Sequence, residues 1–543
     1  MEADIIIKNA NIWTVDDAHP RARSLAIRGR EIVYVGSDDG AQAWSGTATR
    51  VLDLRGLLVL PGFNDCHTHF VNAALRFATN FDLYRVTEMA EVQRRLRQFS
   101  QENPKNDWLH GMRWFPTRMD SIHLAGQPAW PTRAELDAVE SQRPVVIFDI
   151  DGHSCWTNTA AIERMGYSAS TPDPEGGQIL RDESGYPTGI FFEVAQEAFQ
   201  RYPPVSAAEF PGLFQREVAR LNRLGLTSIS NNGVLPLYLD VIEQMDANNS
   251  LHVRINEWPS ILDGLENAVA LRQRFSSSER IRVGTVKAFM DGVSSNYSAW
   301  MLEPFADKPG ETGYPVIDPQ KLEALVIAAD RLCFQVATHV IGTRAVRAML
   351  DMVEKARDEN GQRDSRHRLE HVECAHPDDR RRFAELGVIA SMTPLHCTAD
   401  LEGYYISRLG AAGHLGFAWR SFLEAAGGHL AFGTDWPAVD LQEPSPLEQI
   451  FAAVTRCTPE NYGKLKWHLE QCVSVQQAIR CCTLEGAYAE KMDHRKGSLT
   501  PGKLADIIVL SENILESAPE KILETRVVMT IFDGEIVHGQ EQF

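Results

Sequence analysis

The sequence lacks the features that mark several classes of protein. No apolar run approaches the roughly 18–20 residues of a membrane-spanning helix, so we expect no membrane partner. The nine cysteines are an odd number in 543 residues and include no C-x-x-C motif. We therefore expect no disulfide framework. A reducing cytoplasmic location is expected instead. The first residues are acidic and show no signal-peptide pattern, which favours the same location.

Positive charge is also scarce. The chain has 54 Lys and Arg against 73 Asp and Glu, a net charge of −19, and the acidic residues are spread rather than clustered. Such a surface is unsuited to nucleic acid or to an anionic membrane. Apolar residues make up 44% and charged residues 23%, which is typical of a folded soluble protein. We therefore expect a soluble protein that binds neither nucleic acid nor a membrane surface.

The two ends of the chain share a β-rich texture with tight turns. Residues 4–9, 24–36 and 51–56 read as short strands, and so do residues 502–510 and 527–537. Neither end has enough strands to make a stable sheet pair alone. We therefore predict one composite β-sandwich built from residues 1–56 and 497–543.

Between the ends, strand-like runs alternate with helical stretches, which indicates βα units around a parallel sheet. Eight such runs predict an α/β fold of the (β/α)8 TIM-like barrel type over residues 57–496. Further runs at residues 108–114 and 144–151 are assigned to an inserted α/β subdomain at about residues 75–212. The eight runs are residues 57–69, 226–230, 251–256, 281–290, 333–339, 367–372, 388–392 and 429–435.

Residues able to bind metal occupy five of these runs. In an extended strand alternate side chains share a face, so a histidine pair one residue apart points to the same side. Taken singly, each residue has an ordinary explanation, such as a hydrogen-bonded surface histidine or a turn aspartate. In a barrel the carboxyl ends of the strands converge, so these side chains would meet. The candidate metal ligands are His67, His69, Lys287, His339, His371 and Asp435.

This set of residues resembles the amidohydrolase superfamily. Finer matches resemble the amidohydrolase family 3 branch, which includes N-substituted formamide deformylases. The resemblance covers essentially the whole chain, the insert included. The matching motifs are residues 61–67, 287–292, 368–371 and 497–506, with residues 151–154 and 185–189 in the insert.

The resemblance implies one or two divalent metal ions, with zinc as the expected metal. The more buried ion would be bound by His67, His69 and Asp435. The second ion would be bound by His339 and His371. Neutral imidazoles and carboxylates are the usual oxygen and nitrogen ligands of zinc.

The resemblance also implies that Lys287 is carboxylated and bridges the two ions. Carboxylation converts a cation that would be costly to bury into an anionic oxygen ligand. The implied activity is that of a metal-dependent amidohydrolase, which cleaves an amide or formamide-like C–N bond other than a peptide bond. Water activated by metal would attack the carbonyl, with Asp435 as general acid and base.

Substrate contacts are harder to assign. The resemblance implies that His153 of the insert reaches the mouth of the barrel, although a structural histidine explains it equally well. Trp114 and Trp436 could form apolar walls, and His396, after the seventh strand, is a further candidate contact. Buried aromatic residues are more often simply core. Other candidates for apolar walls or for contact with a substrate carboxylate are Trp156, Phe289, Arg113 and Arg118.

Three alternatives stay open. A mononuclear deaminase or cyclic amidase of the same fold would use similar ligands, although such deaminases usually lack a lysine ligand in the position of Lys287. Isomerase or lyase chemistry could use the same metals. A non-catalytic scaffold predicts missing ligands, and the sequence has them all. A homodimer is an open expectation for the assembly.

Overall fold

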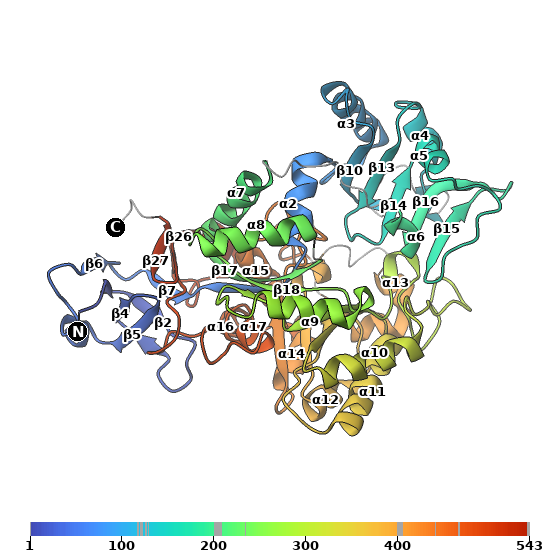
Figure 1. The fold of residues 1–543 in the computed structure, drawn as a ribbon. Helices are drawn as coiled ribbons and strands as arrows, with labels where there is room; N and C mark the ends of the chain where they lie inside the picture. The colour runs from blue at the N-terminus through green and yellow to red at the C-terminus, as the bar shows by residue number, and fades with distance from the viewer. Residues whose placement is uncertain are drawn as a thin grey trace.

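The computed structural model describes residues 2–116, 119, 123–124, 127–128, 130–199, 209–233, 235–398, 405–439, 441–464 and 467–539. Arg118 lies outside these ranges. In Figure 1 the strands of both chain ends lie at the left, a central α/β region follows, and an insert projects at the upper right. Within the described ranges, no helix is both long enough and apolar enough to cross a membrane.

The central region contains two parallel sheets. One has four strands in the order β19-β18-β17-β8, and the other has five in the order β20-β21-β22-β23-β24. Their strands correspond to the eight runs expected from the sequence, with the run at residues 281–290 divided between β19 and β20. The bounds are β8 (Phe63–Thr68), β17 (Leu226–Asn232), β18 (Arg254–Trp258), β19 (Ile281–Arg282), β20 (Thr285–Phe289), β21 (Gln335–Val340), β22 (Arg368–His371), β23 (Ile389–Met392) and β24 (His429–Phe432).

The two sheets meet at both of their edges. At one edge the backbone N–H of Lys287 donates to the carbonyl of Pro259 at 2.9 Å. At the other the N–H of Asp435 donates to the carbonyl of His67 at 2.8 Å. This second approach needs Gly433, because a Cβ there would lie 2.6 Å from the backbone nitrogen of His67. Both contacts hold candidate ligands at the carboxyl ends of the strands.

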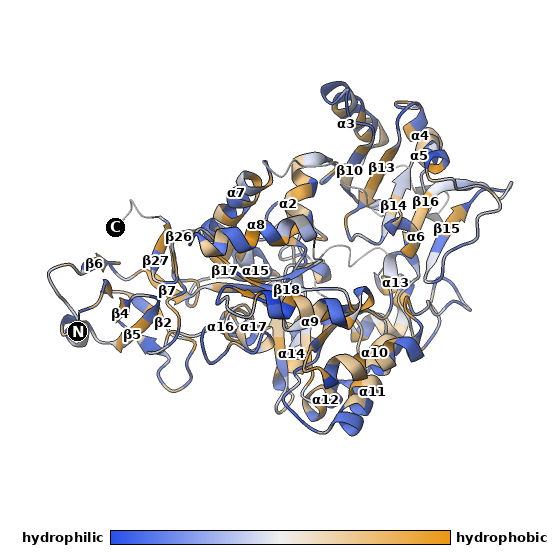
Figure 2. Ribbon diagram, viewed as in Figure 1, coloured by the Kyte–Doolittle hydropathy of each residue, from blue (hydrophilic) through white to orange (hydrophobic). Residues whose placement is uncertain are grey.

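Amphipathic helices follow the strands and cover the sheets. α11 (Thr343–Asn360) buries Val346, Leu350 and Val353 at helical spacing and leaves its other face to solvent. Figure 2 shows hydrophobic and hydrophilic residues together on α10 and α11. The other main helices of this region are α7 (Phe210–Arg223), α8 (Pro236–Ala247), α9 (Leu265–Arg274), α10 (Pro319–Arg331), α12 (Pro377–Leu386), α14 (Trp419–Glu424), α15 (Pro446–Thr455), α16 (Val475–Cys481) and α17 (Leu484–Ala489).

Strands from the two chain ends form a six-stranded sheet in the order β27-β26-β25-β7-β2-β3, and a second sheet has the order β5-β4-β1-β6. Side chains from both ends, including Ile7, Leu25, Val509 and Met529, are buried in one shared core. The bounds are β1 (Ile5–Lys8), β2 (Asn11–Trp13), β3 (Arg21–Ala22), β4 (Ser24–Arg28), β5 (Glu31–Gly36), β6 (Arg50–Asp53), β7 (Leu58–Pro61), β25 (Ile507–Leu510), β26 (Val527–Phe532) and β27 (Glu535–His538).

The run at residues 57–69 differs from expectation, because it is divided at Gly62. β7 pairs with β25 in the terminal sheet, whereas β8 pairs with β17 in the parallel sheet. A Cβ at Gly62 would lie 2.3 Å from Oγ1 of Thr227, so only glycine allows this close passage. The passage from the terminal sheets to the central region, expected after residue 56, therefore lies at Gly62 in the structure.

A buried ion-pair cluster joins the terminal sheets to the parallel sheet. On β18, Nε of Arg254 donates to Oδ2 of Asp506 at 2.9 Å, and Arg254 also pairs with Asp533. Asp533 further accepts from Nε of Arg280 at 3.0 Å. Because Arg254 is only 5% exposed, its charge needs a carboxylate partner, and Asp506 and Asp533 both pair with it.

The insert has its own mixed sheet, in the order β15-β16-β14-β13-β10-β9. The insert spans fewer residues than the expected range of about 75–212. The reason is that α2 (Phe70–Thr79) and α7 pack on the central core through side chains such as Phe70 and Phe214. Both additional runs expected in the insert are strands of this sheet. The bounds are β9 (Phe81–Asp82), β10 (Leu109–Trp114), β13 (Val145–Asp149), β14 (Ser154–Thr157), β15 (Gly177–Arg181) and β16 (Pro187–Glu193).

Candidate functional site

His67 is oriented by a buried carboxylate. Its Nδ1 lies 2.7 Å from Oε2 of Glu370, and Nε of Arg368 donates to the other carboxylate oxygen at 2.6 Å. Burial, helped by the nearby Lys287, lowers the pKa of His67 to about 4. The imidazole is therefore neutral near pH 7. With Nδ1–H donating to Glu370, the lone pair of Nε2 is left to face the cluster.

Asp435 is the centre of this cluster. Its Oδ1 lies 3.4 Å from Nε2 of His67 and 3.3 Å from Nε2 of His69. Its Oδ2 lies 3.5 Å from Nε2 of His396 and 3.9 Å from Nδ1 of His371. Burial opposes ionisation, but the surrounding imidazoles hold the pKa of Asp435 below its usual range. The carboxylate is therefore ionised, and imidazole nitrogens surround it.

Two overlapping groups of candidate ligands follow from these distances. His67, His69 and Asp435 have ligand atoms within 4.8 Å of one another, and so do His371, His396 and Asp435. His396 was expected as a substrate contact, and the structure instead brings it beside Asp435. It comes from η5 (Pro394–Thr398), the short helix after β23.

His339 lies beside the second group. Its ring centroid is 4.6 Å from that of His371, and its Nε2 is 3.1 Å from the carbonyl oxygen of Gly292. The expected pair of His339 and His371 is therefore adjacent. The ring of His339 is hydrogen-bonded to this backbone carbonyl, and His339 belongs to neither of the two groups of candidate ligands.

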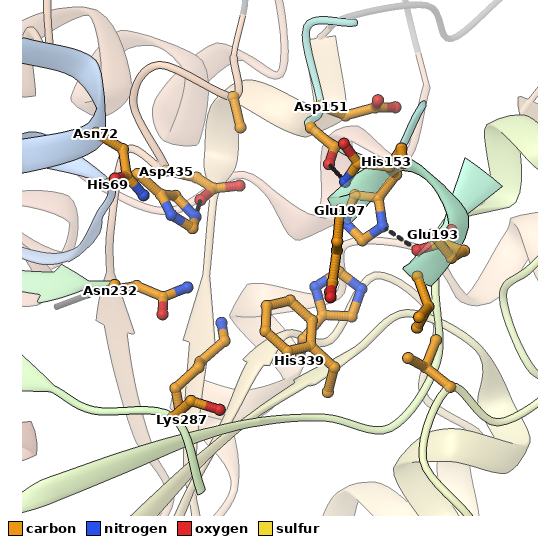
Figure 3. A pocket seen from close by; sticks show the side chains of 18 of the residues that line it. His69, Asn72, Asp151, His153, Glu193, Glu197, Asn232, Lys287, His339 and Asp435 are labelled. Carbon is orange, nitrogen blue, oxygen red and sulfur yellow. Dashed lines mark hydrogen bonds and ion pairs between the residues drawn. The ribbon is translucent and has the colours of Figure 1, made fainter. Parts of the chain in front are cut away.

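Lys287 points its amine into the same space (Figure 3). Nζ lies 3.4 Å from Nε2 of His67 and 4.7 Å from the ring centroid of Phe289. Only 2% of the residue is exposed. Burial lowers the pKa of Lys287 to about 8, although the carboxylates of Glu370 and Asp435 act to raise it.

The residues present fit a divalent metal. Among the described residues, Oδ1 of Asp435 and Nδ1 of His371 are buried without a hydrogen-bond partner. A buried polar atom without a partner is costly unless a ligand satisfies it. The backbones of His371 and Asp435 have φ of 71° and 58°, a strained conformation that is common at functional sites. Imidazole and carboxylate donors suit zinc and similar ions.

The cluster opens into a cavity of about 540 Å³ between the parallel strands and the insert. His69, Lys287, His339, His371 and Asp435 lie on its strand side. Figure 3 shows Asp151, His153, Glu193 and Glu197 gathered on the opposite side. Other lining residues are Asn72, Arg76, Met112, Arg113, Asp149, Glu175, Asn232, Ser260, Leu262, Phe289, Asp318 and Lys321.

His153 lines this cavity, as the sequence indicated. Its Nδ1 lies 2.7 Å from Oε2 of Glu193, and its ring centroid is 4.9 Å from that of His339. Although burial opposes it, the pairing with Glu193 raises the pKa of His153 to about 9. Glu193 has φ of 50° and also accepts from Oγ of Ser298 at 2.6 Å. The insert thus presents a firmly held imidazole to the cluster.

The structure corrects the two tryptophans expected as substrate walls. Trp114 is fully buried in the core of the insert, with its ring 5.4 Å from that of Trp156. Trp436 is also buried and stacks on Phe77 at 5.1 Å. Both side chains fill hydrophobic layers behind the cavity.

Of the remaining candidates, Phe289 and Arg113 line the cavity. Arg113 is committed to structure, because its Nε donates to Oδ1 of Asp82 at 2.9 Å and its Nη1 donates to the carbonyl of Leu441 at 2.7 Å.

Sequence reasoning missed the carboxylates that support the histidines. Glu370 and Glu193 each hold one imidazole, yet neither was singled out. The signal for Glu370 was present, since Arg368 and Glu370 are two residues apart in an otherwise buried strand and must share a face. Glu193 had no comparable signal, because its partner is 40 residues away.

Fold and site together define an α/β protein with candidate metal ligands gathered at the carboxyl ends of parallel strands. The family model described as amidohydrolase family matches residues 50–538, and the chain belongs to the amidohydrolase family. The family resemblance inferred from the motifs is therefore confirmed.

Several known proteins are similar along nearly the whole chain. Protein LONG AFTER FAR-RED 3 of Arabidopsis thaliana is 32% identical, over 94% of this chain and 88% of its own. The N-substituted formamide deformylase of Arthrobacter pascens is 26% identical, over 98% of this chain and 97% of its own. The crystal structure of an uncharacterized metal-dependent hydrolase from Pyrococcus horikoshii has a TM-score of 0.73 at 23% identity, over 95% and 99% of the two chains. That structural likeness supports the fold.

Proposed function

We propose that this protein is a metal-dependent hydrolase that cleaves an amide or formamide-like C–N bond in a small molecule. One observation carries the proposal: several imidazoles, Lys287 and an ionised Asp435 converge at the carboxyl ends of parallel strands and face a cavity. A family relative that is named for deformylation of N-substituted formamides supports the choice of bond.

We also infer that the two parallel sheets make up one (β/α)8 barrel. Contacts at both edges, from Lys287 to Pro259 and from Asp435 to His67, support a closed ring of strands. The chain would then divide into a composite β-sandwich, a barrel and the insert. Nine free cysteines favour a reducing cytoplasm as the location.

The proposed ligands follow from the site. His67, His69 and Asp435 would hold one divalent ion, most simply zinc. His371 would hold a second ion together with His339. His396 is the alternative partner, because its Nε2 lies 3.5 Å from Oδ2 of Asp435. Bound metal would supply Lewis acidity and lower the pKa of water at the site. Lys287, whose amine enters between the two groups, would bridge them after carboxylation.

The chain's own residues suit a hydrolysis. Asp435 is ionised and could take a proton from the attacking water and pass it to the leaving nitrogen. Glu370 keeps His67 in one tautomer, and Glu193 keeps His153 pointed at the cavity. A protonated His153 could donate a hydrogen bond to the substrate carbonyl, where negative charge develops.

A mononuclear deaminase of the same fold is the second candidate. The observation in its favour is the three-residue group of His67, His69 and Asp435, which could hold one ion without a modified Lys287. The reaction separates the two candidates, because the hydrolase releases an amine from an amide whereas the deaminase acts on a ring amidine.

The test begins with the purified protein. Elemental analysis should find one or two zinc-like ions per chain, and a chelator should abolish hydrolysis until metal is returned. A screen of N-formyl, N-acyl and cyclic amides should then identify hydrolysed compounds by the amine released. Full activity after complete metal removal would refute the proposal, and so would the deamination of ring amidines with no hydrolysis of amides.

A further inference from the structure

The insert presents an acidic wall to the cavity. Five carboxylates from this one subdomain line it: Asp149, Asp151, Glu175, Glu193 and Glu197. Glu193 is already engaged by His153 and by Ser298. Asp149 ends β13 and Asp151 follows it, and both residues line the cavity. Figure 3 shows Asp151 there.

Asp149 and Asp151 meet without a cation between them. Asp149 is only 6% exposed, and its Oδ2 accepts from Oγ of Ser154. Oδ2 of Asp151 accepts from Oγ of Ser295 at 3.1 Å. Within the described residues, Oδ1 of each aspartate is buried and has no hydrogen-bond partner. Burial and the neighbouring Asp151 raise the pKa of Asp149 well above its usual range, as two unneutralised carboxyls should.

Three cationic side chains that line the cavity are directed elsewhere, and His153 is paired with Glu193. Arg113 binds Asp82 and the carbonyl of Leu441. The guanidinium of Arg76 lies 5.0 Å from the ring centroid of Phe148. Lys321 is exposed on the first turn of α10. In the described part of the chain, no ion pair joins any of these three to Asp149 or Asp151.

We infer that Asp149 and Asp151 bind a positively charged group of the substrate, such as a primary ammonium, so that the preferred substrates are small amides with a cationic arm. An ammonium has three donors and no acceptor, so it could satisfy both unpartnered oxygens. A bound ammonium would also favour the ionised form of Asp149, whose pKa is otherwise raised, and hydrogen bonds between ionised partners are stronger than neutral ones. The identity of the reaction rests on the proposed hydrolase function, whereas the binding of a cation does not.

The kinetic test uses two substrates of equal size with metal-loaded protein: N-formyl-1,4-diaminobutane, which is cationic, and N-formylpentylamine, which is neutral. We expect the unaltered protein to favour the cationic substrate in kcat/KM by about 10- to 100-fold. Asp151→Asn should remove that preference by slowing only the cationic substrate. Asp149→Asn, which can keep the hydrogen bond from Ser154, should act in the same direction. Glu183→Gln, an exposed charge change in the same subdomain, should change neither rate.

A binding test stands apart from hydrolysis. By calorimetry, 1-aminopentane, which is a cation at neutral pH, should bind more tightly than the equally sized and neutral 1-pentanol, and Asp151→Asn should remove the difference. Equal kcat/KM for both substrates together with equal binding of the amine and the alcohol would overturn the cation site and leave the hydrolase intact. Binding that depends on Asp151 without hydrolysis of either formamide would support the cation site and count against the hydrolase. Melting curves for each variant show that the protein remains folded.

Discussion

At the scale of single residues, Lys287 is the side chain whose chemistry decides the site. If its amine is carboxylated and bridges two ions, Lys287→Ala should lose metal content and hydrolysis together, because the bridging oxygens are gone. A short carboxylic acid added to the variant should restore part of both. Elemental analysis and amine release measure the two effects. An unmodified lysine, seen in high-resolution density of fully active protein prepared with bicarbonate, would refute the bridge and favour a single ion.

Glu370 is the residue that orients His67 without touching substrate. Glu370→Gln keeps the shape but weakens the acceptor that fixes the imidazole tautomer. We expect metal affinity to fall about 10- to 100-fold, since supporting hydrogen bonds to a metal-binding histidine have effects of that size. Competition with a coloured chelator measures this affinity. Activity should recover at high metal concentration, and Glu385→Gln, on the exposed side of α12, serves as the control. An unchanged affinity would show that His67 does not depend on this carboxylate.

At the scale of elements, the passage of the chain from β7 to β8 depends on Gly62. A methyl group there would overlap with Thr227, so Gly62→Ala should destabilise the protein by about 1–3 kcal/mol. Urea unfolding measures the loss. Adding Thr227→Ala should restore part of it, because the clash is with that side chain. If the second substitution only adds to the loss, the close packing at this point is not the reason for glycine.

The candidate residues at the strand ends could be predicted from the sequence, but the residues that they contact could not. Metal-binding residue types at the ends of apolar runs identified His67, His339 and Asp435, because strand-end position is a local property. The placement of His396 depends on the turn that follows β23, which periodicity does not specify. Trp114 was misassigned for a related reason: its place in the sheet depends on the register with β13, set by pairing between segments far apart in sequence.

At the scale of the whole molecule, the cluster around Arg254 joins the terminal sheets to the central region. Arg254→Met would leave Asp506 buried without its cation and would remove one guanidinium partner of Asp533, which keeps Arg280 and Arg30. This should cost about 3–5 kcal/mol at pH 7. Arg254 helps to depress the pKa of Asp533, although burial opposes it. The lowered pKa contributes stability above the usual value of 3.8, and this stability is lost as the pH falls through the folded-state pKa.

The difference between Arg254→Met and the unaltered protein should therefore shrink in acid. Urea unfolding at pH 7 and near pH 3, which is below the usual pKa of 3.8, tests this, with the exposed Arg526→Met as control. A loss that is equal at both pH values would point to packing rather than charge as the role of Arg254.

The backbone contact between Asp435 and His67 also bears on how the protein is made. His67 leaves the ribosome early, whereas Asp435 is among the last parts of the central region to be synthesised, and β7 must wait longer still for β25. A nascent chain therefore holds its histidine pair and an unpaired strand edge exposed through most of translation. The candidate ligands can bind metal together only after Asp435 has been synthesised, so the maturation of this site comes after the translation of β24, and chaperones are expected to matter most before that moment.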